Sequence, residues 1–254
     1  MEQIYSQDFF LSAGEADAEK EMALPVLVSK IIDIATAHAN SLGIGNPDMQ
    51  DKEEGWVLSR LTIDMKRYPA VNDTYRLSTW VESWNRHFST RCFRISTPEG
   101  EILGYARSVW MVLNTRTRAN AGLSHLHLPE GTICTEPCPI EKQARHTKIG
   151  EGGIEASVPA VGYRFKYCDL DSYRHVNTVR YVQLLLNQMP LSRYDECRLS
   201  RLELSFLHEA RYGMEVRLER SDDPENPLLS SFYLEANDTT AILFARVLFT
   251  PREK

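Results

Sequence analysis

The chain repeats part of its own sequence, and this repeat limits the folds open to its 254 residues more than any other feature. Residues 58–77, LSRLTIDMKRYPAVNDTYRL, align without a gap to residues 199–218, LSRLELSFLHEARYGMEVRL, at an offset of 141 (199 minus 58). Six of these twenty positions are identical, where unrelated sequences would share about one. Tyr105-Ala106-Arg107 and Phe244-Ala245-Arg246 match next, at an offset of 139 (244 minus 105). Two similar strands can agree by accident, but two matches in the same order at nearly one offset favour a duplicated folding unit.

Each half has the same coarse layout of one helix followed by a run of strands. In the first half Pro25 opens a run of apolar residues with helical spacing that ends near Gly43, and in the second half a helix is predicted over about 176–188. Alternating, β-rich segments follow each helix, near 56–65, 74–84, 89–96 and 102–114, and near 199–208, 214–220, 229–236 and 241–249. This order predicts an α+β fold with antiparallel strands rather than repeated βαβ units. No Gly-rich phosphate-binding motif is present.

Residues 121–157 are rich in Gly and Pro and are interpreted as the connection between a first half at 1–120 and a second at 158–254. This connection also contains residue types that bind zinc: His125, His127, Cys134, Cys138 and His146. Because the second pair of ligands lacks a regular spacing, an ordinary connecting segment is the favoured interpretation, and neither a metal nor a cofactor is predicted.

Composition and charge exclude several classes of protein. The chain is 43% hydrophobic with a formal net charge of -6, which disfavours a disordered chain and a general nucleic-acid binder. No apolar run reaches the roughly 18 residues of a membrane-spanning helix. The first residues are acidic and match neither a secretory signal nor a transit peptide, so we expect a cytoplasmic protein or a trimmed mature form. Five cysteines, an odd number, fit reduced thiols.

The two halves differ in the residues that carry chemistry. Asp171 and His175 lead into the helix of the second half, whereas the corresponding Gly14-Glu15-Ala16-Asp17-Ala18-Glu19-Lys20 has no histidine. At the offset of 141, Glu209 aligns with Tyr68. A carboxylate can activate water, a histidine can share its proton, and N–H groups at a helix start can bind a carbonyl oxygen. The asymmetry favours one reactive half, although helix capping and a solvated charge are alternative roles for these residues.

A covalent mechanism has little support. The nearest cysteines, Cys168 and Cys197, lie outside both segments and are interpreted as structural, and no Gly-x-Ser-x-Gly motif occurs. We therefore expect direct attack by water on an activated acyl group.

These residues also resemble a known family. The pattern Asp169-Leu170-Asp171-x-x-x-His175-Val176-Asn177-x-x-x-Tyr181 is similar to the active-site segment DLDxNxHVNNxxY of plant and bacterial acyl-acyl carrier protein (acyl-ACP) thioesterases. Further stretches agree in order over nearly the whole chain: 37–43, 56–60, Tyr68-Pro69, 80–82 and 110–118. The resemblance implies a double (tandem) hotdog fold, in which each half is a curved antiparallel sheet around a long helix. It implies hydrolysis of the thioester that joins a fatty acyl chain to the carrier protein, a reaction of fatty acid biosynthesis.

The resemblance also implies roles for single residues. The second half would be catalytic, through Asp171, His175 and Glu209, and the first half would shape the acyl pocket. Asn177, Tyr173 and Val176 would contact the substrate. Tyr173 stands where the family has an asparagine, so either Tyr173 reaches the substrate in another way, or Asn177 or backbone donors carry more of the carbonyl binding. Ala210 stands where plant members have a cysteine.

The implied partner is acyl carrier protein with its phosphopantetheine-linked acyl chain. Because that protein is acidic, its docking surface should be basic. Residues 161–201 hold seven Arg or Lys residues against four acidic ones, or +3. An acyl-CoA thioesterase, a hotdog enzyme of another reaction such as dehydration, and a non-catalytic acyl-chain binder are the alternatives. The sequence leaves open the acyl chain length and saturation, the preference for carrier protein over CoA, and the oligomeric state, a homodimer included.

Overall fold

The computed structural model describes residues 3–45, 49 and 53–252. The chain divides into two compact units, Met1–Glu141 and Lys142–Lys254. The boundary between these units falls inside the segment 121–157 that the sequence predicts as a connection.

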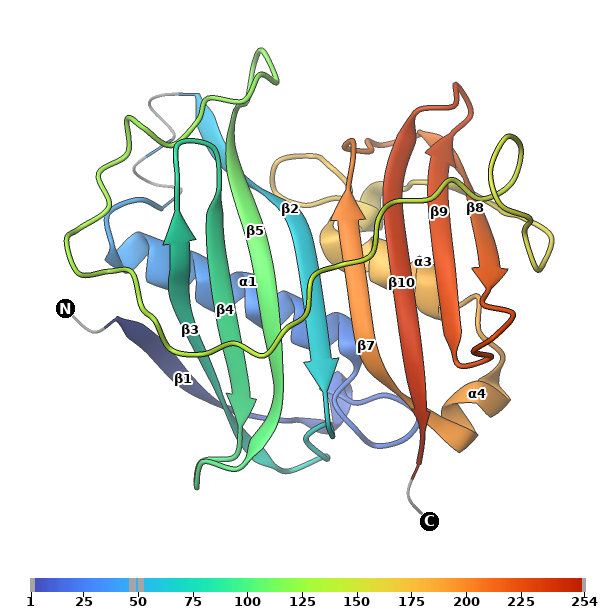
Figure 1. The fold of residues 1–254 in the computed structure, drawn as a ribbon, viewed down its shortest axis with the longest axis horizontal. Helices are drawn as coiled ribbons and strands as arrows, with labels where there is room; N and C mark the ends of the chain where they lie inside the picture. Colours follow the sequence, from blue (N-terminus) through green and yellow to red (C-terminus); the bar gives the residue numbers. More distant parts are fainter. Residues whose placement is uncertain (1–2, 46–48, 50–52, 253–254) are drawn as a thin grey trace. The chain divides into compact units, whose positions relative to one another are not determined.

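The first unit is an antiparallel sheet with one long helix on a face of it (Figure 1). The helix α1 (Leu24–Ser41) begins with a proline in its first turn and buries Leu27, Val28, Ile31 and Ile34, one face at helical spacing. Gly43 ends it with a φ of 69°, which a glycine adopts without strain. The strands pair in the order β1-β3-β4-β5-β2, and they are β1 (Ile4–Phe10), β2 (Glu54–Met65), β3 (Thr74–Trp84), β4 (Ser89–Ser96) and β5 (Ile102–Asn114).

The second unit repeats this topology. Its strands pair in the order β6-β8-β9-β10-β7, so each strand takes the place that its counterpart has in the first unit. They are β6 (Val161–Arg164), β7 (Cys197–Phe206), β8 (Glu215–Asp222), β9 (Leu229–Ala236) and β10 (Ala241–Pro251). Two helices, α3 (Thr178–Leu186) and α4 (Leu191–Glu196), precede β7. The predicted α+β fold of two hotdog halves is confirmed.

The repeated tetrapeptide Leu-Ser-Arg-Leu produces the same irregularity in both units. In the first, Leu58 pairs with Trp110 and Arg60 with Val109, which leaves Ser59 as an extra residue. In the second, Leu199 pairs with Phe249 and Arg201 with Leu248, which leaves Ser200 as the extra residue. Each is a β-bulge, which bends the strand and shifts which residues face the core. The sequence identity at these positions therefore reflects a shared backbone geometry.

Four elements differ from the sequence prediction. The edge strands β1 and β6 were not predicted, because their mostly exposed residues show no burial pattern. The helix of the second half is shorter than the long helix predicted over 176–188. Asn177 caps its start, and Pro190 disfavours helical backbone at the residue before it, so the chain begins a separate short helix, α4. Among the described residues, none of the helices combines the length and hydrophobicity that crossing a bilayer requires.

Candidate active site

Asp171 organises the turn that carries His175. One carboxylate oxygen of Asp171 accepts hydrogen bonds from the N–H groups of Tyr173 and His175, at 2.9 and 3.0 Å. The Asp171 N–H donates to the His175 carbonyl at 2.8 Å, and Arg174 has a φ of 65° at the tip of the turn. Aspartate is suited to this position, because its short side chain can accept from the backbone two to four residues further on. The carboxylate of Asp171 therefore fixes the backbone of His175.

The first unit contains the same turn at an offset of 154 (171 minus 17). One carboxylate oxygen of Asp17 accepts from the N–H groups of Glu19 and Glu21, at 3.0 and 3.2 Å. The Asp17 N–H donates to the Glu21 carbonyl at 2.8 Å, and Lys20 has a φ of 61°. This aspartate turn is thus part of the duplicated architecture. The chemical difference between the halves lies in the residue that the turn presents, His175 in one and Glu21 in the other.

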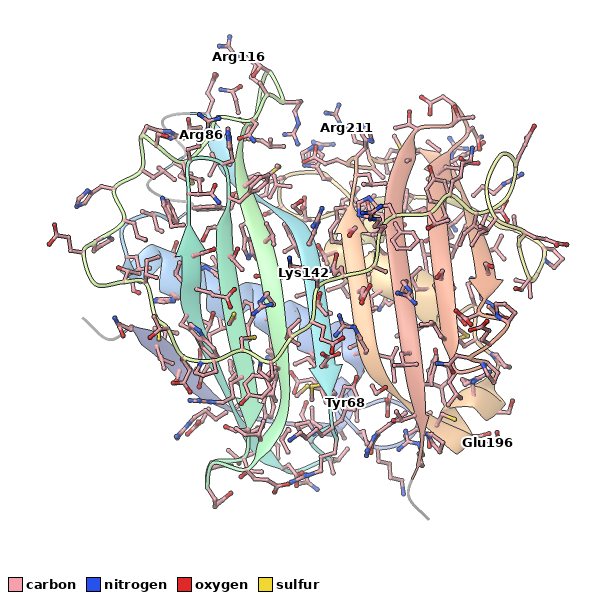
Figure 2. All side chains as sticks on the ribbon, viewed as in Figure 1. Tyr68, Arg86, Arg116, Lys142, Glu196 and Arg211 are labelled. Carbon is pink, nitrogen blue, oxygen red and sulfur yellow. The ribbon has the colours of Figure 1, made fainter. Side chains whose placement is uncertain are left out.

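A backbone bridge brings His175 to Glu209. His175 forms an isolated antiparallel bridge with Arg211, and the Val176 N–H donates to the Ala210 carbonyl at 2.9 Å. As a result, Nε2 of His175 lies 3.5 Å from Oε2 of Glu209, with the two side chains 21% and 27% exposed. Water can reach both groups. In the first unit the position of Glu209 is taken by Tyr68, which is buried just beyond the end of β2 (Figure 2).

Tyr181 contacts the backbone next to Glu209 from the buried side of the site. It lies on the buried face of α3, and its hydroxyl oxygen accepts the N–H of Ala210 at 3.3 Å. Its ring packs edge-on against Phe165 and Phe206. Burial raises the pKa of Tyr181, so it stays a neutral phenol. The sequence pattern includes this tyrosine without indicating its role, which is to hold the residue next to Glu209.

Asn177 is the N-cap of α3. Its side-chain oxygen accepts the Val179 N–H at 2.9 Å, and its carbonyl accepts the Arg180 N–H at 2.9 Å. Both of these early N–H groups are therefore used within the cap. The side-chain oxygen of Asn177 is thus used in the cap, and its amide group also carries a nitrogen that can donate hydrogen bonds.

The remaining residues of the motif have different surroundings. Tyr173 is 47% exposed, at the tip of the turn. Val176 is buried, and its N–H is already bonded to Ala210. Asp169 is buried and structural: it accepts from the Tyr163 hydroxyl at 3.0 Å and the Lys166 N–H at 2.6 Å.

Of the residues of the connection that could bind zinc, His125 and His146 have partners apart from the two cysteines, which share one cluster. His125 lies 2.7 Å from a carboxylate oxygen of Glu54, Cys134 packs in a cluster with Trp80, and His146 packs against Phe244. Within the part of the chain that the structure describes, no three His, Cys, Asp or Glu side chains form a possible metal site.

Six of the seven basic residues of 161–201 divide into two groups. Arg180 pairs with Asp169, Arg193 lies over the ring of Phe249, and Arg201 pairs with Glu203. Arg164, Lys166 and Arg174 are exposed on the segments around the aspartate turn. Arg211, which lies outside the predicted stretch, is also exposed and is bridged to His175 (Figure 2). We call these four residues the basic rim.

Comparison with known proteins gives consistent matches to one family. Residues 2–124 match the model "Acyl-ACP thioesterase N-terminal domain" and residues 156–250 the model "Acyl-ACP thioesterase C-terminal domain". A palmitoyl-acyl carrier protein thioesterase, chloroplastic, of Gossypium hirsutum is 27% identical over 216 residues, which cover 81% of this chain and 52% of that protein. The chain thus spans about half the length of this curated relative.

Two solved structures resemble the chain over nearly its full length. The structure of an acyl-ACP thioesterase from Bacteroides thetaiotaomicron has a TM-score of 0.87 at 28% identity, covering 98% of both chains. The 12:0-ACP thioesterase from Umbellularia californica has a TM-score of 0.84 at 20% identity, covering 98% of this chain and 95% of that one. The second likeness concerns the fold alone.

Proposed function

Because the chain belongs to the acyl-ACP thioesterase family, we propose that it hydrolyses the thioester of a fatty acyl chain on acyl carrier protein and releases the free fatty acid. The observation that carries this proposal is the His175–Glu209 pair, which only one of the two halves contains. In this proposal the second half is catalytic and the first half shapes the acyl pocket.

The reaction follows from the groups around the pair. The Glu209 carboxylate takes a proton from a water molecule, whose oxygen attacks the thioester carbonyl carbon. The tetrahedral intermediate collapses, the carbon–sulfur bond breaks, and the pantetheine sulfur leaves. Protonated Glu209 gives this proton to His175, 3.5 Å away, and His175 donates it to the sulfur, which returns Glu209 to the carboxylate. Overall, the reaction consumes one water molecule and forms one free fatty acid and one thiol.

The developing oxyanion requires donors, and the start of α3 supplies them. We assign this contact to the amide nitrogen of Asn177 and to the Thr178 N–H, because the next two N–H groups are bonded within the cap. Asp171 is a positioning residue that holds His175 through the turn. Val176 contributes an apolar wall, and exposed Tyr173 contacts the substrate at the entrance.

The test is turnover of acyl-ACP by the wild type and two site variants. Glu209→Gln removes the base with little change of shape, and His175→Ala removes the proton carrier; each should lower kcat by roughly 10²–10⁴-fold. Glu21→Ala, at the position of the first half that corresponds to His175, is the matched control and should keep wild-type kcat. Site variants that retain wild-type kcat would refute the assignment. Binding of acyl-ACP without turnover by the wild type would instead identify an acyl-chain binder.

The basic rim is the surface on which we place the acidic carrier protein. Two of its four exposed cations adjoin His175, Arg174 as its neighbour in the chain and Arg211 through the backbone bridge, so a carrier docked there would deliver its arm to the site. Arg174→Glu and Arg211→Glu should raise KM for acyl-ACP, and the wild-type KM should rise with salt. Arg193→Glu, on the cation that packs over Phe249, is a comparison variant outside the rim. An unchanged KM in the rim variants would refute the proposal that the carrier protein docks on this surface.

The substrate carrier is tested by rates on matched thioesters. For one acyl chain, kcat/KM should be higher for the carrier-protein thioester than for the CoA thioester. A higher kcat/KM for the CoA thioester would identify the enzyme as an acyl-CoA thioesterase. A panel of chain lengths then defines the acyl specificity. A cytoplasmic location stays a prediction, which fractionation of cells would test.

A further inference from the structure

A strap crosses the sheet of the first unit on the face opposite α1. We define the strap as residues 132–141, which run over β3, β4 and β5 (Figure 1). The Cys134 N–H donates to the Val81 carbonyl at 2.9 Å, and Arg94 pairs with Glu136 at 2.8 Å. The guanidinium of Arg107 donates to the carbonyls of Cys138 and Ile140, at 3.0 and 2.7 Å. These contacts hold the strap against side chains of the sheet.

Three cysteines meet between the strap and the sheet, Cys134 and Cys138 of the strap and Cys92 of β4. Cys92 of β4 is fully buried in a cluster with Trp80 and Cys134, and Cys138 packs against that cluster. Cys92 pairs across the sheet with both Trp80 and Arg107, so these three side chains stand in one row on the strap side. Cys138 therefore packs beside Cys92, and its sulfur donates to the Ala106 carbonyl at 3.7 Å. Cys138 is half-buried, whereas Cys92 and Cys134 are buried, so Cys138 is the member of the cluster that solvent can approach.

The two thiols of this pair have different reactivities. The hydrogen bond from Cys92, together with the positive charge of Arg107, lowers the pKa of Cys138 against the effect of burial. The same hydrogen bond and burial raise the pKa of Cys92. The thiolate is the form that reacts with peroxides. Cys138 is therefore the residue that is oxidised first, and Cys92 is placed to react with the product.

We propose that Cys92 and Cys138 form an oxidation site, at which a peroxide converts two thiols into a disulfide between the strap and β4. In the first step the Cys138 thiolate attacks the peroxide, which gives a sulfenic acid and water when hydrogen peroxide is the oxidant. In the second step the Cys92 sulfur attacks the sulfenic sulfur, the sulfur–oxygen bond breaks, and a second water leaves. A dithiol reductant reverses the modification by thiol–disulfide exchange.

The disulfide would restrain the end of the first unit. It closes a loop of 46 residues (138 minus 92) that contains β5 and the whole chain up to the strap. A cross-link of this span removes conformational freedom mainly from the unfolded chain. None of the residues proposed for catalysis takes part, so oxidation should act on stability and on the mobility of the strap.

The test uses a Cys168→Ser background, because Cys168 is exposed and would react on its own. Treatment with hydrogen peroxide should give a cross-linked Cys92–Cys138 peptide after non-reducing digestion, with loss of two hydrogen atoms. The melting temperature should rise by roughly 5 °C or more and return to its original value with a dithiol reductant.

Two further variants separate this site from its neighbours. Cys134→Ser changes a thiol of the same cluster and should keep both the cross-link and the increase in melting temperature. Cys138→Ser, a change at a partly exposed position, should abolish both while leaving the reduced protein folded. A cross-link to Cys134 instead, or sulfinic acid at Cys138 with no cross-link, would overturn the proposal.

Discussion

The aspartate turns of the two halves allow the structural and chemical roles of Asp171 to be separated. Asp171→Ala removes the acceptor of two N–H bonds, at 2.9 and 3.0 Å. Hydrogen bonds to a charged group contribute about 1.5–3 kcal/mol each when buried. Because Asp171 is only half-buried, water can replace part of these hydrogen bonds in the variant. We therefore expect a total loss of about 1–3 kcal/mol in unfolding free energy. Asp17→Ala removes the equivalent bonds at an exposed position and should cost about 1 kcal/mol.

The effect on activity should differ between the halves. Without its turn, His175 moves relative to Glu209, and a displacement of about 1 Å lowers catalysis about 10²-fold. Asp171→Ala should therefore lower kcat about 10²-fold, whereas Asp17→Ala should leave kcat unchanged. Asp171→Asn keeps an oxygen that can accept both N–H bonds and should lose less than about tenfold, as expected of a positioning residue.

The measurements are single-turnover hydrolysis of acyl-ACP and urea denaturation of the same four proteins. The reasoning fails if Asp171→Asn loses as much kcat as Asp171→Ala at unchanged stability. That result would mean that the negative charge of Asp171 acts on the substrate or on His175 directly.

Three further predictions concern residues around the two sheets. Tyr181→Phe removes the acceptor of the buried Ala210 N–H, so it should lower the unfolding free energy by about 1–2 kcal/mol, measured by denaturation. It should also lower kcat in a turnover assay, because Ala210 is the neighbour of Glu209. An unchanged kcat would show that Tyr181 does not support Glu209. Burial and Arg91 lower the pKa of His38 to about 4, below the 6.5 of the unfolded chain. Stability is therefore complete above about pH 6.5 and falls as the pH drops toward 4, by at most about 3 kcal/mol. His38→Asn keeps an acceptor for Arg91 and should flatten this dependence in denaturation series, whereas an equally steep series would point to other groups. Deleting Ser200 removes the extra residue of the bulge, and Leu199–Phe249 and Arg201–Leu248 can then pair as neighbours in a regular ladder. The deletion variant should therefore still fold, as judged by circular dichroism, and Ser200→Ala should cost about 1 kcal/mol for its bond to the Leu248 carbonyl. An unfolded deletion variant would contradict the bulge assignment.

Local sequence patterns predicted eight of the ten strands that the structure describes and the helix α1. They succeeded because alternation of apolar residues, prolines and turn residues are properties of neighbouring positions. They missed β1 and β6, edge strands that only pairing with β3 and β8 reveals. They also gave the second helix too great a length, because apolar Val176 continues the helical spacing on the far side of the N-cap Asn177.

The candidate site was predictable in its composition and not in its geometry. The repeat identified Glu209 and His175 as differences between halves, since both are visible in an alignment of the chain with itself. Asp171 looked like a third difference, but Asp17 makes the same turn in the first unit. The roles of Tyr181 and Arg211 depend on contacts between segments about thirty residues apart, which no local pattern encodes.

The sequence by itself determined the duplication, the α+β order of elements and which half contains His175 and Glu209. All three can be read from the spacing of neighbouring residues and from an alignment of one half with the other. Only the tertiary structure decided which residues meet: His175 with Glu209, Tyr181 with Ala210, and Cys92 with Cys138. The physical reason is that these contacts depend on strand register, bulges and the path of the strap. Those features follow from the pairing of distant backbone and the burial of side chains between layers, which no single segment specifies.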